Sequence, residues 1–265
     1  MNLRDADLRF LLPEPPQSVA LLDAPPAAAE AWRGAGVEVV QAQGSVRPHL
    51  VVAPRPRLED ALQRQPEMLV VYGRVSRRRL ATAGYRAAHL LALPSPHGPR
   101  LVLPLTSGRA IDSALSRVGQ RRLSRSAARR SAGRLFLRSG WAPPGATVTI
   151  AARSAPRPWL IGHLDADTRD AVPTDWYLWL GEGDPLQRAV LHIPTSTGGY
   201  AIKFSRVVGN AAPFRNEARA SQAAAQLPLE LAQHVPRIYT SSSDGQLAFV
   251  VETRFAGRPL TEVLQ

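Results

Sequence analysis

One lysine stands alone among the cationic side chains of this sequence. The 265 residues include 33 lysines and arginines together, and Lys203 is the only lysine. Alanine, arginine, proline and glycine are abundant, which is typical of a GC-rich genome in which arginine replaces lysine wherever either serves. An ammonium is a compact point charge on a slim stem, whereas a guanidinium is a broad planar fork. The pattern therefore indicates that position 203 needs the compact cation.

Other familiar patterns of chemistry are missing from the sequence. Cysteine is absent, which excludes disulfides, thiolate metal sites and cysteine nucleophiles, and fits a reducing cytoplasm. The six histidines show no clustering of the kind that binds a metal. Neither a G-x-S-x-G element nor a Walker-type loop occurs. Lys203 and its surroundings are therefore the main candidate for a functional site.

The residues from Trp176 onward have the pattern of antiparallel strands around this lysine. The turn at 196–199 contains two glycines, which supply the positive φ angles that tight hairpins need. An alanine-rich helix is predicted after the lysine strand, with Glu217 in its first turns. The predicted strands are WYLWLG (176–181), RAVLHIPT (188–195), YAIKFSR (200–206) and two more within 235–264, around the turn Asp244-Gly245.

This order of elements resembles the N-terminal lobe of a protein-kinase-like fold, in the aminoglycoside phosphotransferase and choline-kinase-like family. YAIK resembles the V-A-I-K signature of kinases, NEARA resembles the αC segment of that family, and ETRFAGRPL resembles its hinge. The resemblance covers roughly the last third of the chain, residues 176–265. It implies a five-stranded antiparallel sheet with one αC-type helix.

The resemblance also implies roles for individual residues in binding ATP. Lys203 would contact the α- and β-phosphates, and Glu217 would pair with it and hold its ammonium in place. A loop at 181–183 would cover the phosphates, although the third glycine of G-x-G-x-x-G is missing. The hinge backbone at 252–255 would face the adenine, and Ile202 and Val251 would line the pocket. The nucleotide-binding residues so implied are Lys203, Glu217, Gly181, Gly183, Ile202, Glu252, Arg254 and Phe255, with Mg²⁺ accompanying ATP in a full-length homologue.

The catalytic residues of that family all follow the hinge, and the sequence ends at Gln265. One H-x-D element exists upstream, beginning at His163, but it precedes the lysine strand and is followed by Asp170 where asparagine is required. We therefore expect a truncated phosphotransferase or a pseudoenzyme, inactive as given, and leave open whether it is an enzyme. Its apolar underside, left exposed, would favour a protein partner.

The first part of the chain alternates apolar runs with helical segments, which predicts an α/β sheet with parallel strands. The first strand-to-helix turn, at 23–26, has no glycine and two prolines, so it lacks the close backbone approach that a cofactor phosphate needs. This part resembles a degenerate Rossmann-like or methyltransferase-like domain, in a scaffold or docking role. Strands are predicted at 18–23, 37–40, 49–53, 67–73, 87–93 and 100–105, and helices at 27–36, 58–65 and 77–84.

The predicted domains follow from these patterns. They are a degenerate Rossmann-like domain at 1–110, a basic helical connector at 111–140, a linker rich in proline and glycine at 141–175, and the kinase-like lobe at 176–265.

The formal net charge of +12 raises the alternative of a nucleic-acid partner. Much of the charge lies at 117–138, where aromatic residues that could stack on single-stranded bases are almost absent. We favour a solvated basic helix there and consider nucleic acid the less favoured partner. No run approaches the ~20 apolar residues of a membrane helix, and the first residues lack the pattern of a signal peptide. A soluble cytoplasmic protein is therefore expected.

Overall fold

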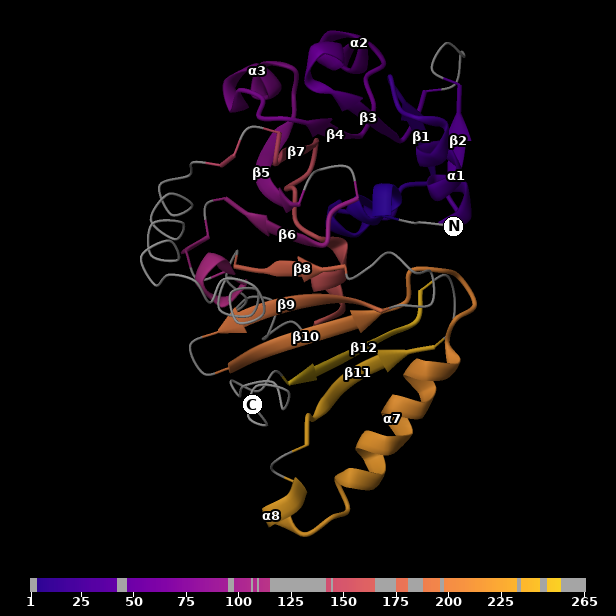
Figure 1. Ribbon diagram of the computed structural model, residues 1–265, viewed down its shortest axis with the longest axis vertical. Coiled ribbons are helices and arrows are strands. Elements are labelled where there is room, and N and C mark those ends of the chain that lie inside the picture. The colour runs from indigo at the N-terminus through magenta and orange to yellow at the C-terminus, as the bar shows by residue number, and fades with distance from the viewer. Residues whose placement is uncertain are drawn as a thin grey trace.

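The fold is built on a single twelve-stranded sheet that runs the length of the molecule (Figure 1). Its strand order is β11-β12-β10-β9-β8-β6-β5-β7-β4-β3-β1-β2. The structure, a computed structural model, describes residues 4–41, 47–94, 98–105, 107–108, 110–114, 142–143, 145–164, 175–180, 188–195, 198–232, 235–243 and 247–253.

The strands are β1 (Ser18–Leu21), β2 (Glu38–Val40), β3 (Leu50–Pro54), β4 (Met68–Tyr72), β5 (Arg86–Leu93), β6 (Leu101–Pro104), β7 (Thr147–Ala152), β8 (Tyr177–Trp179), β9 (Ala189–Thr195), β10 (Gly198–Phe204), β11 (Ile238–Ser242) and β12 (Phe249–Thr253). The α-helices are α1 (Pro26–Gly34), α2 (Leu58–Gln63), α3 (Arg77–Thr82), α7 (Ala212–Ala224) and α8 (Leu229–Ala232), and the 3-10 helices are η1 (Arg4–Leu11), η2 (Arg55–Arg57) and η3 (Trp159–His163). No helix among the described residues is long and apolar enough to cross a membrane.

The four strands β1 to β4 are parallel, as the alternation of strands and helices predicted. β3 and β4 are buried over nearly their whole length, which is typical of parallel strands covered on both faces. Helix α1 begins with Pro26, whose missing N–H is no loss in the first turn of a helix. It then buries Ala28, Ala31 and Trp32, whose spacing places them on one face.

The next three strands differ from the parallel arrangement that we predicted. β5 and β6 form an antiparallel pair, because the short connection between them leaves no room for a crossover helix. β7 comes from the segment 141–175, which we predicted to be a linker, and it lies in the middle of the sheet between β4 and β5. All six residues of β7 are buried, as expected for a strand with apolar neighbours on both faces.

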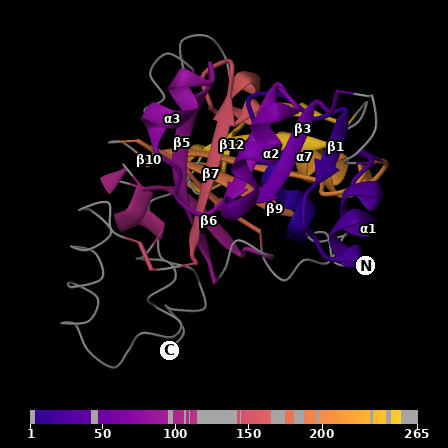
Figure 2. The same cartoon turned by 90° about the horizontal axis from the view of Figure 1, so that it is seen from above.

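The strands after residue 176 are all antiparallel, in the order β8-β9-β10-β12-β11, and α7 follows β10 (Figure 1). They continue the same sheet, because β8 pairs with β6 through Trp179 opposite Leu101 and Leu178 opposite Val102. Seen from above, the strands of the two halves run in clearly different directions (Figure 2). Accumulated right-handed twist has this effect in a sheet of many strands.

One hydrophobic core extends across both halves of the sheet. Phe10 of η1 packs against Phe204 of β10, with ring centroids 4.4 Å apart. Asp7, also in η1, pairs with Arg206, which follows β10, and both side chains are fully buried. The amino-terminal segment therefore covers the face of β10 and β12 that contains Phe204 and Val251.

A buried histidine joins the centre of the sheet to the turn after β4. Nδ1 of His89 in β5 lies 3.2 Å from Oγ1 of Thr149 in β7, and this hydroxyl donates to the carbonyl oxygen of Gly73. Burial, and to a smaller extent the positive charges of Arg77 and Arg74, lowers the pKa of His89 to about 4. The imidazole is therefore neutral near pH 7.

This lowered pKa predicts a loss of stability in acid. Since the unfolded chain binds a proton at the usual histidine pKa of 6.5, stability is complete above that pH and falls as the pH drops towards about 4. We expect His89→Gln to reduce this loss by about 2 kcal/mol. Urea unfolding at several pH values in this window measures the difference. Equal slopes for the two proteins would contradict the prediction, and His163, whose pKa burial also lowers, contributes to both.

Candidate functional site

The hairpin of β9 and β10 positions Lys203. Gly198 and Gly199 begin β10 with φ angles of 140° and 122°, which only glycine adopts readily. In this register, Lys203 lies opposite Val190 of β9 and Val250 of β12. Because side chains alternate along a strand, Lys203 and Ala201 share one face of the sheet.

Two carboxylates hold the ammonium of Lys203. Its Nζ atom lies 2.6 Å from Oε1 of Glu217 in α7 and 2.7 Å from Oε1 of Glu252 in β12. The Lys203 side chain is 25% exposed, and the Glu217 and Glu252 side chains are 20% and 10% exposed. Both ion pairs are therefore largely shielded from water. Charge–charge attraction is stronger in such surroundings than at an open surface.

A second cation completes this group of charges. Arg188, just before β9, forms an ion pair with Oε2 of Glu217. Its guanidinium lies 5.1 Å from the ring centroid of Phe214 in the first turn of α7. Phe214 is the buried anchor of that helix and packs against Ala248 and Val250. Arg188 and Phe214 thus fix the end of α7 from which Glu217 reaches Lys203.

We call Arg188, Glu217, Lys203 and Glu252 the Lys203 cluster. Its positive and negative charges alternate and sum to zero. An ammonium has three N–H donors, and the two carboxylates occupy two of them. No third partner of Nζ is found among the residues that the structure describes, so the remaining N–H can donate to an anionic oxygen that approaches through the exposed part of the side chain. The cluster can therefore hold and orient a cation against an anion such as a phosphate.

The face of the sheet that contains Lys203 extends towards β8. His192 lies opposite Ala201, and its ring stacks on Tyr177 with the centroids 4.6 Å apart. Ala201, His192 and Tyr177 are all buried, so this part of the face is packed against other residues.

The structure brings together some of the predicted site residues and separates others. Lys203, Glu217 and Glu252 are in contact, although Glu252 contributes its carboxylate and not only the backbone that we predicted for it. Ile202 is fully buried in the main core on the opposite face of β10, as is Val251 in β12, so neither lines a pocket with Lys203. Gly181, Gly183, Arg254 and Phe255 lie outside the described residues.

Two residues of this site were missed in the sequence, and each had a signal. Ala201 is two positions before Lys203, so strand alternation places it on the lysine face where we had assigned Ile202. Arg188 begins the predicted strand that pairs with the lysine strand, but its contact with Glu217 depends on the position of α7. Local sequence does not fix that position.

The H-x-D element was not expected to be catalytic, and two other predictions, the nucleic-acid partner and the protein partner, are not tested by the structure. His163, of the upstream H-x-D element, lies between Trp159 and Phe249, with ring centroids 5.4 Å and 4.2 Å away, so it is part of the packing. The basic segment 117–138 lies outside the described residues, and binding of nucleic acid there stays a prediction. A protein partner also stays a prediction.

Comparison with protein-family models, curated proteins and solved structures gives no match.

Proposed function

We propose that the last third of the chain, residues 176–265, is the nucleotide-binding lobe of an ATP-dependent phosphotransferase of the kinase-like class. The observation that carries this proposal is the 2.6 Å contact between Lys203, the only lysine of the chain, and Glu217. Lys203 lies on the third of five antiparallel strands, and Glu217 lies on the helix that follows it. This is the arrangement in which kinases orient their phosphate-binding lysine.

In this proposal the third N–H of Lys203 donates to a phosphate oxygen of ATP, and Glu217 keeps the ammonium in place. Mg²⁺ arrives bound to the nucleotide and neutralises part of its charge. No group of three residues suited to a metal occurs among the residues that the structure describes.

Glu252 opposes the anion in this arrangement. Its carboxylate is 2.7 Å from the same ammonium, so it competes with a phosphate for Lys203 and repels the phosphate charge. The proposed site therefore binds nucleotide less tightly than it would with a neutral residue at position 252. Substitutions of Lys203 and of Glu252 should therefore change the affinity for nucleotide in opposite directions.

We expect Lys203→Met to weaken binding of Mg·ATP by about tenfold or more, since a hydrogen bond to a charged group contributes about 1.5–3 kcal/mol. Lys203→Arg should also weaken it, because the wider guanidinium does not fit between the two carboxylates. Glu252→Gln should strengthen binding a few-fold. Isothermal titration calorimetry on the full chain measures all three affinities.

The matched control is Arg219→Gln, which removes one positive charge from an exposed position of α7. It should leave the affinity within about twofold of the wild type, because exposed charges are screened by salt. Thermal unfolding of each variant separates lost binding from lost structure. The proposal fails if folded Lys203→Met binds Mg·ATP as well as the wild type does, or if the wild type shows no saturable binding.

A further inference from the structure

A cavity of about 450 Å³ lies where segments far apart in the sequence meet. Its lining comes from η1, the turn after α1, η3, the loop after β10 and the start of β12. The lining includes the rings of Phe10, Trp159, His163 and Phe249, and we call it the aromatic cavity. Sites for small molecules are typically concave, of about this size, and lined mainly by apolar and aromatic side chains with a few polar groups.

Hydrogen bonds and ring contacts hold the rings of η3 at the cavity. The backbone N–H of Trp159 donates to the carbonyl oxygen of Leu12 at 2.8 Å, which fixes the start of η3 beside the end of η1. The imidazole of His163 lies between Trp159 and Phe249, with ring centroids 5.4 Å and 4.2 Å away. A wall of rings held in this way suits a flat aromatic molecule, because rings attract one another in stacked and edge-to-face arrangements.

Two ring nitrogens of η3 have no hydrogen-bond partner among the described residues. They are Nε1 of Trp159 and Nε2 of His163, and both are buried. An indole N–H is a donor only, and a buried donor without an acceptor is unfavourable. An oxygen atom of a bound molecule would supply that acceptor. Because both nitrogens are shielded from water, the lining side chains must adjust slightly to admit this oxygen, as side chains commonly do on binding.

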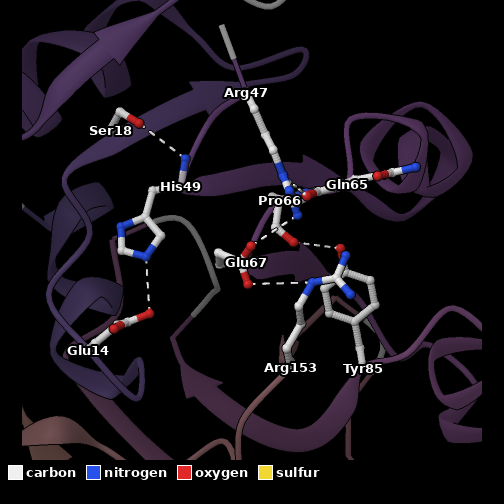
Figure 3. Close-up of polar contacts among 9 residues, drawn as sticks. All are labelled: Glu14, Ser18, Arg47, His49, Gln65, Pro66, Glu67, Tyr85 and Arg153. Atoms are coloured by element: carbon white, nitrogen blue, oxygen red, sulfur yellow. Dashed lines mark hydrogen bonds and ion pairs between the residues drawn. The ribbon is translucent and has the colours of Figure 1, made fainter.

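Two other rings of the amino-terminal half have partners for their polar atoms (Figure 3). Nε2 of His49 lies 3.1 Å from Oε1 of Glu14. The hydroxyl of Tyr85 donates to the carbonyl oxygen of Pro66 at 2.6 Å. Buried polar groups are normally paired in this way. The unpaired nitrogens at the aromatic cavity are therefore exceptions that a ligand would explain.

The charged residues of the lining favour a neutral ligand over an anion. The guanidinium of Arg206 pairs with Asp7. That of Arg9 donates to the carbonyl oxygens of Ala6 and Arg206. Burial lowers the pKa of His163 below its usual value, so its imidazole is neutral near pH 7. Both arginines thus have partners within the chain, and the donors that remain for a ligand are neutral.

We propose that the aromatic cavity binds a neutral, planar aromatic molecule that carries an oxygen acceptor such as a ring carbonyl. The rings of the lining pack against its flat body, and its oxygen accepts a hydrogen bond from Nε1 of Trp159. A polar atom next to that oxygen pairs with Nε2 of His163. Val208, which is 60% exposed, also lines the cavity and gives it an apolar rim.

The aromatic cavity is distinct from the Lys203 cluster. Lys203 lies opposite Val250 of β12, and Phe249 is the preceding residue of that strand. Since side chains alternate along a strand, Phe249 is on the face of the sheet opposite to Lys203. The proposal therefore does not depend on the binding of a nucleotide.

Equilibrium dialysis of isocarbostyril and naphthalene against the full chain tests the proposal. Isocarbostyril is a neutral two-ring lactam, and naphthalene has a similar shape without a polar atom. We expect isocarbostyril to bind saturably and Trp159→Phe to weaken this binding about threefold to tenfold, the usual contribution of a neutral hydrogen bond. Naphthalene cannot accept such a bond and should bind both proteins equally.

Trp179→Phe is the matched control, because it makes the same change on β8, outside the described lining of the cavity. It should leave the affinity for isocarbostyril within about twofold of the wild type, as should Lys203→Met, since distant sites act independently. The indole N–H resonance of Trp159, identified by its nuclear Overhauser contacts with His163, should shift as isocarbostyril is added, and this readout needs no variant. No saturable binding, as expected of a cavity that holds only water, would overturn the proposal. Equal weakening in Trp159→Phe and Trp179→Phe would overturn it too.

Discussion

Replacing Asp7 with alanine should lower the free energy of unfolding by about 3–5 kcal/mol, because it leaves Arg206 charged and buried without its carboxylate. Both side chains are fully buried. Arg9 loses a partner as well, since its guanidinium lies 3.6 Å from Asp7. Burial already lowers the pKa of Arg9 to about 10, and the carboxylate acts against that shift. Urea unfolding followed by circular dichroism measures the loss.

An exposed ion pair is the matched control for this effect. Glu59 pairs with Arg79 on neighbouring helices, and their side chains are 59% and 56% exposed. Glu59→Ala should change stability by no more than about 1 kcal/mol, because water solvates the remaining arginine. The double variant Asp7→Ala/Arg206→Leu should recover part of the loss. If Asp7→Ala costs no more than Glu59→Ala, the buried pair does not connect the two halves as described.

The second large effect is expected at the start of β10. In Gly199→Ala the new methyl group would lie 2.1 Å from the carbonyl oxygen of Ile193 in the neighbouring strand, and the φ angle of 122° is strained for alanine. Since the contact is with backbone, the β9–β10 pairing must shift. We expect a loss of at least about 3 kcal/mol, measured by urea unfolding.

Gly162→Ala is the control for that substitution. Gly162 has no atom within 4 Å of the added methyl group, so its stability should stay within about 0.5 kcal/mol of the wild type. The Gly199 variant should also lose affinity for Mg·ATP if the Lys203 cluster is the nucleotide site, since the hairpin places Lys203. Normal stability of Gly199→Ala would contradict the register described for β9 and β10.

Local patterns in the sequence predicted most of the elements, because local chemistry decides them. The apolar runs at 18–23, 37–40, 49–53 and 67–73 correspond to β1, β2, β3 and β4. Buried parallel strands need apolar residues on both faces, and the helices between them need an apolar stripe. The parallel part of the sheet therefore follows from the order of apolar runs and helical segments along the chain.

The arrangement beyond those strands depends on contacts far apart in the chain. β7 pairs with β4 and β5, and nothing near 147–152 indicates which strands will flank it. β8 has three residues, and its pairing with β6 joins the two halves that we had predicted as separate domains. Pairing between strands so far apart in the chain leaves no periodic signal in the sequence.

The candidate site likewise has features that the sequence predicted and features that depend on contacts far apart in the chain. Lys203 and Glu217 were singled out by residue type and by the order of elements, and the structure places them 2.6 Å apart. The carboxylate of Glu252 depends on the register of β12 against β10, and the burial of Ile202 depends on which face η1 covers. The role of Lys203, Glu217 and Glu252 in binding a nucleotide stays a prediction.

The position of η1 has a consequence for how the chain acquires its structure during synthesis. Asp7 and Arg206 are 199 positions apart, and Arg9 donates to a carbonyl oxygen 197 positions away. Asp7 and Arg9 are therefore synthesised long before Arg206 and must wait for the intervening chain before they meet their partners. Contacts of such long range slow folding and leave apolar surface such as Phe10 uncovered meanwhile. The amino-terminal half thus completes its core only after β10 has been made.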